Sequence, residues 1–184
     1  ERAPHRVGRG AGQLLRGAVE ERHVAVTVQG DDPFAHPLQD GRGARALGFG
    51  NFSVAGHDRG ARVAFRMCLD RPESVTRMAA LDIVPTHHVL TNVTLGWGLE
   101  AYHWFFMAQK APFPEKLLTA DLSYYIDYKL NKKGVGLEIF SPEAMAEYKR
   151  CTTPEQIHAV CEDYRATVTV DLALDTADFG RGTI

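Results

Sequence analysis

The feature that most constrains this chain is a five-residue segment, Gly56-His57-Asp58-Arg59-Gly60, placed between an apolar run and a helical pattern. The apolar run covers residues 52–55 and predicts a buried strand, and a helix is expected from about residue 59. Glycine suits the ends of such a segment, because a sharp strand-to-helix turn brings the backbone close to itself and strains its central residue. The spacing is that of a nucleophile elbow, G-x-Nu-x-G, with Asp58 in the nucleophile position.

An aspartate at this point can act as a nucleophile without further activation. The turn places Asp58 at a helix N-terminus, where the helix dipole favours an anion. An ionised carboxylate attacks carbon directly, with no base needed to remove a proton first. The competing interpretation is structural, since aspartate is also a common helix N-cap residue, and the pentad alone does not separate the two roles.

Several further segments of the chain match one family in the same order. The sequence resembles the fluoroacetate (haloacetate) dehalogenases of the α/β-hydrolase superfamily, over about residues 44–179. The resemblance rests on residues 56–62, 80–85, 102–104, 111–115 and 161–165. It implies an α/β fold: a partial α/β-hydrolase core, with parallel strands around the nucleophile elbow, and a helical cap.

The resemblance also implies roles for individual residues. Asp58 would displace halide from the α-carbon of a haloacetate and form an ester, which water would cleave to give glycolate. Asp82, at the end of the strand after the elbow helix, would orient a catalytic histidine. His103, Trp104 and Tyr164 match the halide-binding positions, and each can donate a hydrogen bond to a departing anion. Without the resemblance, the three rings would be interpreted as core aromatics and Asp82 as an ordinary strand-end residue.

Two arginines follow the proposed nucleophile. Arg59 and Arg62 are three residues apart and therefore share one face of the expected helix. A guanidinium group binds a carboxylate through two parallel hydrogen bonds, each worth roughly 1.5–3 kcal/mol. Given the resemblance, the pair would anchor the substrate carboxylate, and the backbone N–H of Arg59 would serve as an oxyanion donor. On spacing alone, a pair of surface arginines is the competing interpretation.

Four segments are expected along the chain. Residues 1–43 are rich in arginine and glycine and do not match the family, which predicts a poorly ordered segment with one strand-like run at 24–28. Residues 44–88 would form the core fragment with the elbow. Residues 89–167 would form the helical cap, and residues 168–184 a truncated return to the core.

Within these segments the pattern predicts individual elements. The expected strand at 75–84 would pair with residues 52–56 on one side. No strand is evident that would pair with them on the opposite side, so an exposed sheet edge is expected there. Residues 99, 102, 103 and 106 fall on one helical face. Ser141 and Thr153 are expected N-caps, each followed by proline at the first helical position. The remaining expected elements are a helix at 59–69, a strand at 75–84 and a helix at 122–130.

The family pattern leaves two expected features unmatched. No His-Gly dipeptide occurs in the sequence, so the loop that supplies part of the oxyanion hole is not found. The catalytic histidine of α/β hydrolases comes last in chain order, and the C-terminal part that would carry it is expected to be missing. None of the candidates His57, His87, His88 and His158 fits the position of the general base. Hydrolysis of the ester would therefore lack its base.

Composition excludes several other classes of protein. The 184 residues are 45% hydrophobic and carry a net charge of −2, which gives no reason to expect nucleic acid or a membrane surface as a partner. Cys68, Cys151 and Cys161 form no C-x-x-C pair, which favours a cytoplasmic setting over a disulfide framework or a zinc site. No metal or organic cofactor is implied, and a homodimer stays open.

The sequence thus predicts a haloacetate dehalogenase-like hydrolase acting on a small haloacid. An epoxide hydrolase or haloalkane dehalogenase shares the aspartate nucleophile and is the alternative within the hydrolases. Those enzymes usually carry tryptophan after the aspartate, whereas Arg59 favours a carboxylate substrate. The alternative from another class is a non-catalytic fragment of such an enzyme.

Overall fold

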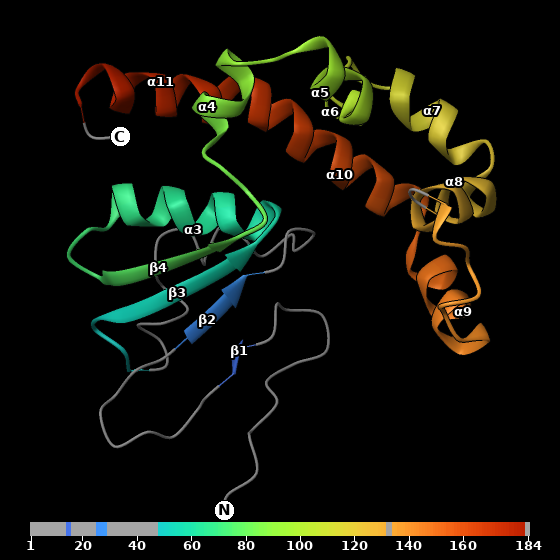
Figure 1. Cartoon of the computed structure of the whole chain (residues 1–184), viewed down its shortest axis with the longest axis horizontal. Coiled ribbons are helices and arrows are strands. Elements are labelled where there is room, and N and C mark those ends of the chain that lie inside the picture. Colours follow the sequence, from blue (N-terminus) through green and yellow to red (C-terminus); the bar gives the residue numbers. More distant parts are fainter. Residues whose placement is uncertain (1–13, 16–24, 29–47, 132–133, 183–184) are drawn as a thin grey trace, which may run out of the picture. The chain divides into compact units, whose positions relative to one another are not determined.

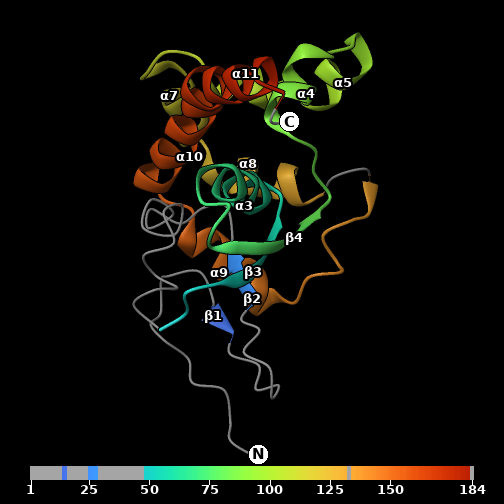
Figure 2. The same ribbon diagram turned by 90° about the vertical axis from the view of Figure 1, so that its left-hand side faces the viewer.

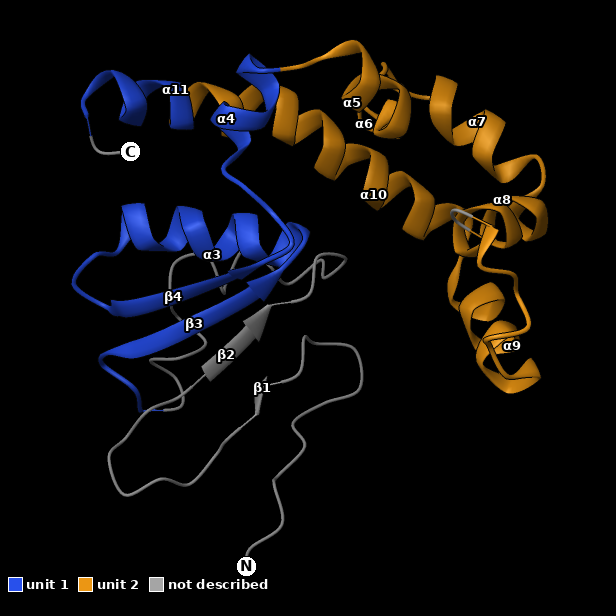
Figure 3. Ribbon diagram, viewed as in Figure 1, with its two compact units in different colours: residues 1–92, 175–184 blue, residues 93–174 orange. Residues whose placement is uncertain are grey.

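The computed structural model describes residues 14–15, 25–28, 48–131 and 134–182. The chain divides into two compact units, residues 1–92 with 175–184 and residues 93–174 (Figure 3). These boundaries differ by several residues from the expected segments 44–88, 89–167 and 168–184. Residues 1–43 were expected to be poorly ordered. Apart from the short strands at 14–15 and 25–28, this segment lies outside the described residues.

The first unit contains a four-stranded sheet in the order β1-β2-β3-β4. The strands are β1 (Leu14–Leu15), β2 (Ala25–Val28), β3 (Phe52–His57) and β4 (Val75–Leu81). β2, β3 and β4 are parallel, while β1 pairs antiparallel with β2. β2 lies beside β3 in Figure 1, and the strand-like run at 24–28 is confirmed. The expectation of an exposed edge at 52–56 is wrong, because β2 pairs with β3 on that side.

Helix α3 (Arg59–Asp70) connects β3 to β4 and lies against one face of these two strands (Figures 1 and 2). Alternate residues of β3, Phe52 and Val54, are 2% exposed. They meet a helical stripe of Ala61, Ala64 and Met67, which is fully buried or nearly so. Buried residues therefore recur every second position on β3 and every third position on α3, and together they form one shared core.

β4 ends at Leu81, three residues earlier than the predicted strand at 75–84. Asp82 follows with a positive φ of 55°, a left-handed conformation that an extended strand cannot contain. The chain then runs through Pro85 into helix α4 (Thr86–Thr91), which the sequence pattern did not predict.

The last helix, α11 (Leu172–Gly180), is joined to α3 by an ionic network within the first unit. Arg66 Nη1 lies 2.7 Å from a carboxylate oxygen of Asp178 and 3.3 Å from one of Asp175. Asp175 and Asp178 are 3% and 5% exposed, and Arg66 supplies a counter-charge to both of these buried carboxylates. Hydrogen bonding from Arg66, with a further contact from Arg181, holds the pKa of the Asp178 carboxyl below its usual range.

The second unit is helical, as the sequence predicted for most of this region. Its helices are α5 (Leu95–Glu100), α6 (Tyr102–Met107), α7 (Phe113–Thr119), α8 (Leu122–Leu130), α9 (Pro142–Cys151) and α10 (Pro154–Ala166), followed by a π-helical segment, η2 (Thr167–Asp171). The helix at 122–130 and the N-caps Ser141 and Thr153 are confirmed. The expected helical face at residues 99–106 is divided instead, because α5 ends before Ala101 and α6 begins after it.

The core of the second unit forms where α10 meets α6. Ile157, Cys161 and Tyr164 lie on one face of α10 and pack with Met107 of α6. Burial raises the pKa of the Cys161 thiol to about 11, so this cysteine is an inert part of the core. No helix in the described part of either unit combines the length and the apolar character needed to cross a membrane.

Candidate functional site

The turn between β3 and α3 has the geometry of a nucleophile elbow. Asp58 has φ 50° and ψ −122°, a region that residues other than glycine rarely adopt. Asp58 and Asp82 are the two non-glycine residues with positive φ in the part of the chain that the structure describes. The backbone N–H of Asp58 donates to the carbonyl of Leu81 at 3.3 Å, which fastens the strained residue to the end of β4.

Gly56 is required by the close return of the chain at this turn. A Cβ atom at this position would lie 2.6 Å from the backbone N and Cα of Ala61, and closer still to the carbonyl oxygen of Gly60. Side-chain carbons do not approach backbone atoms so closely in folded proteins. The first glycine of the pentad therefore lets the start of α3 pack directly on the end of β3.

The alternative role of Asp58 as a helix cap does not agree with the structure. Asp58 occupies the N-cap position of α3, but its side chain makes no capping hydrogen bond. Only its backbone carbonyl takes part, accepting from the N–H of Ala61 at 3.0 Å. The exposed carboxylate is thus held in strained backbone without stabilising the helix, an arrangement that suits a reacting group.

The two arginines after Asp58 differ in environment. Arg59 is 7% exposed, while Arg62 is half-buried. The Nη1 of Arg62 donates to the hydroxyl of Thr86 at 2.6 Å, and both residues line a small cavity of about 150 Å³ with otherwise apolar walls. Thr86 is 3% exposed and opens α4 directly after Pro85. Sequence reasoning missed this residue, although its place after a strand-ending proline marks a helix start.

Asp82 lies close to the elbow because of the parallel register. His57 pairs with Leu81 at the ends of β3 and β4. Asp58 and Asp82 directly follow these two paired residues, so both lie at the same end of the sheet. The carboxyl ends of parallel strands are where such sheets bind ligands. The structure therefore brings the predicted nucleophile and the predicted orienting acid to one edge of the sheet.

The three proposed halide-binding residues come together within the second unit. The rings of His103 and Trp104 on α6 lie 5.8 Å and 6.0 Å from the ring of Tyr164 on α10, both edge-to-face. Trp97 on α5 packs edge-to-face against Trp104 at 5.3 Å and was not singled out from the sequence. The sequence holds no signal for this contact, because Trp97 and Trp104 lie on separate helices that break at Ala101.

Two of the candidate histidines contact residues other than the two aspartates. His87 stacks on Phe179 at 4.4 Å, and His158 Nδ1 lies 3.2 Å from Glu115. Among the residues that the structure describes, no histidine hydrogen-bonds to Asp58 or Asp82. The geometry therefore assigns the role of general base to none of them.

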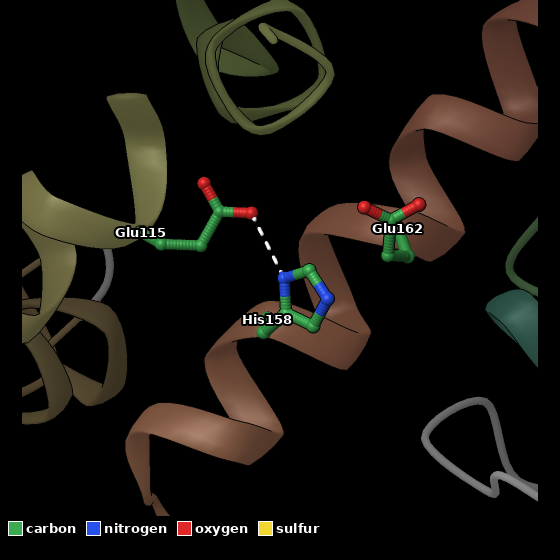
Figure 4. A group of neighbouring side chains, drawn as sticks. All are labelled: Glu115, His158 and Glu162. Carbon is green, nitrogen blue, oxygen red and sulfur yellow. Dashed lines mark hydrogen bonds and ion pairs between the residues drawn. The ribbon is translucent and has the colours of Figure 1, made fainter. Parts of the chain in front are cut away.

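One group of described side chains in the second unit has metal-ligand chemistry: Glu115, His158 and Glu162, with ligand atoms within 4.8 Å of one another (Figure 4). The guanidinium of Arg165 already pairs with both carboxylates, at 2.7 Å from Glu115 and 2.6 Å from Glu162. Burial opposes the charge of Glu115. Hydrogen bonds from its own backbone N–H, Arg165 and His158 nevertheless keep the pKa of its carboxyl below the usual range. Since Arg165 serves as the cation, the cluster ties α7 to α10.

Solved structures identify the class of fold. The chain superimposes with a TM-score of 0.72 and 41% identity on a Pseudomonas aeruginosa protein provisionally named an epoxide hydrolase, covering 80% of this chain and 49% of that one. A provisionally named α/β hydrolase from a Nostoc species gives a TM-score of 0.70 at 44% identity, over 78% and 49% of the two chains. The fold is therefore a partial α/β-hydrolase core, as predicted from the sequence.

Sequence comparison identifies two curated relatives of this chain. The chain is 43% identical to the fluoroacetate dehalogenase of a Burkholderia species over 139 residues, which are 74% of this chain and 46% of that protein. It is 27% identical to the soluble epoxide hydrolase of a Corynebacterium species, over 74% and 48% of the two proteins. No family model matches the chain. The predicted resemblance is thus confirmed, and the chain spans about half the length of the curated relatives it matches.

The packing at the elbow predicts the effect of adding one methyl group. Gly56→Ala should destabilise the protein by about 1–3 kcal/mol, because the new Cβ must displace the backbone at the start of α3. Gly50→Ala is the matched control, since a Cβ there meets no atom within 4 Å, and it should change stability by less than about 0.5 kcal/mol. Urea unfolding followed by circular dichroism measures both. Equal stability of the two variants would contradict this account of the elbow.

Proposed function

We propose that this chain carries the nucleophilic half-site of a haloacetate dehalogenase-like hydrolase. The observation that carries the proposal is the exposed carboxylate of Asp58, held in strained backbone at the elbow and followed at once by Arg59 and Arg62. The 43% identity to a fluoroacetate dehalogenase supports the choice of substrate class.

The first chemical step is a displacement at carbon. A carboxylate oxygen of Asp58 attacks the α-carbon of the haloacetate, a carbon–oxygen bond forms, and the halide leaves with the electrons of the carbon–halogen bond. Arg59 and Arg62 would hold the substrate carboxylate and offset its repulsion from Asp58. His103, Trp104 and Tyr164 would donate hydrogen bonds to the departing halide.

The second step is hydrolysis of the enzyme ester. Water attacks the carbonyl carbon of the Asp58 ester, the bond from that carbon to the glycolate oxygen breaks, and glycolate leaves with a proton. The N–H of Arg59 would stabilise the oxyanion that forms during this attack. The step needs a general base, and no described histidine hydrogen-bonds to Asp82, the residue proposed to orient one.

Epoxide hydrolysis is the second candidate function, favoured by the 27% identity to a soluble epoxide hydrolase. An epoxide carries no carboxylate for the two arginines after Asp58 to hold, whereas a haloacetate presents one. The arginine directly after the nucleophile therefore favours the haloacid. For the cellular setting we propose the cytoplasm, which agrees with three cysteines that are all free thiols.

The proposed carboxylate anchor predicts the behaviour of Arg62→Ala. Loss of a charged hydrogen bond worth roughly 1.5–3 kcal/mol should weaken fluoroacetate binding by about tenfold to a hundredfold. Calorimetric titration in an Asp58→Asn background measures binding without covalent reaction. Arg77→Ala on the exposed face of β4 removes the same charge elsewhere and should leave the affinity unchanged. An unchanged affinity of folded Arg62→Ala would remove Arg62 from the site.

Counting halide ions tests the proposed reaction. Because attack by Asp58 needs no base and hydrolysis does, the chain should release at most about one halide per molecule and then stop. A fluoride electrode, with fluoroacetate as substrate and Asp58→Asn as the control, gives this stoichiometry. Sustained turnover would show that one of the histidines at 57, 87, 88 or 158 supplies the base. No release from a folded chain would favour the non-catalytic alternative.

A further inference from the structure

The second unit contains a pocket of about 430 Å³ that shares one wall residue, His103, with the proposed halide site and is otherwise lined by residues that the proposed reaction does not use. We call it the tyrosine pocket. α6 contributes Tyr102 and Phe106 to its walls, and α8 contributes Tyr124, Tyr125 and Tyr128. Its other walls come from His103 and apolar side chains of α6 and α7. Five benzene-type rings around one hollow give it a surface that is mainly aromatic.

The rings are placed by direct contacts. Tyr124 and Tyr128, one turn apart on α8, stack with ring centres 6.2 Å apart and planes inclined by 27°. The ring of Tyr102 on α6 lies 5.9 Å from the ring of His103, edge-to-face. Burial, together with the hydroxyls of Tyr128 and Tyr124, raises the pKa of Tyr102 above its ordinary value. The phenol of Tyr102 therefore stays neutral at physiological pH, and the rings of Tyr102, Tyr124 and Tyr128 are exposed to a solute.

The charge of the pocket is negative. Among the described residues that line it, Asp121 is the one carboxylate, and none is lysine or arginine. Asp121 is fixed in place because it caps α8, accepting the N–H of Tyr124 at 2.9 Å. The adjoining hollow, which shares Tyr102 and Tyr128, adds Glu100 and Lys129, whose opposite charges offset each other.

We propose that the tyrosine pocket binds a methylated organic ammonium ion. The faces of aromatic rings attract cations, and a quaternary ammonium group suits them because it has no N–H bonds to satisfy and is weakly hydrated. The carboxylate of Asp121 supplies the complementary charge. An anion would be repelled by this carboxylate, and a neutral solute of the same shape would gain only the burial of its methyl groups.

Choline and its uncharged isostere 3,3-dimethylbutan-1-ol separate charge recognition from apolar burial. In NMR titrations of the full 184-residue chain, choline should shift the resonances of α6 and α8 and saturate at millimolar concentration. The isostere should bind at least about fivefold more weakly, since it has no positive charge to interact with the rings. Equal affinity for the two ligands, or no binding of choline, would overturn the proposal.

Three variants locate the site. Tyr128→Phe keeps the ring face and should leave choline affinity within about twofold, whereas Tyr128→Leu should weaken binding by about two- to fivefold. Asp121→Asn removes the charge but keeps a good helix cap, so it should weaken choline and leave the isostere unchanged. Circular dichroism checks that α8 persists. If Tyr128→Leu loses its fold, the Asp121→Asn result decides, and an unchanged choline affinity there would overturn the proposal.

Discussion

The backbone conformation of Asp58 is the constraint on which the rest of the candidate site depends. A residue with φ 50° and ψ −122° persists only where its surroundings fix it from both sides. Here β3 and α3 press together across Gly56, and the N–H of Asp58 is bonded to the last residue of β4. The strain is therefore maintained by the packing of the whole strand–helix–strand unit, and the carboxylate stays exposed with no hydrogen bond to the helix that it would otherwise cap.

The parallel pairing of β3 with β4 explains why Asp58 and Asp82 lie at the same edge of the sheet. Two strands in register bring the residues after their carboxyl ends to one edge, so Asp58 and Asp82 become neighbours although 24 residues separate them. Arg62, one turn into α3, reaches Thr86 at the start of the next helix. Contacts between segments far apart in the sequence, made possible by the parallel pairing of β3 and β4, thus assemble these polar groups of the first unit.

Much of this architecture was predictable because it depends on local chemistry. The apolar run before Gly56, the helix after it and the caps Ser141 and Thr153 each follow from the properties of a few adjacent residues. The pairing of β2 with β3 was not predictable, because a four-residue strand inside an arginine- and glycine-rich segment carries no information on its partner. The early end of β4 was missed for a related reason, since Asp82 breaks the strand by its backbone conformation and not by its residue type. Trp97, the hydrogen bond from Arg62 to Thr86 and the tyrosine pocket needed three-dimensional contacts to be seen.

The central claim is that Asp58 attacks the substrate carbon. Mass spectrometry of peptides after incubation with chloroacetate tests it directly, with Asp58→Asn as the control. The account predicts that the peptide containing Asp58 gains one carboxymethyl group as an ester, and that the variant does not. A label confined to the cysteines at 68, 151 and 161, with Asp58 unmodified, would contradict it.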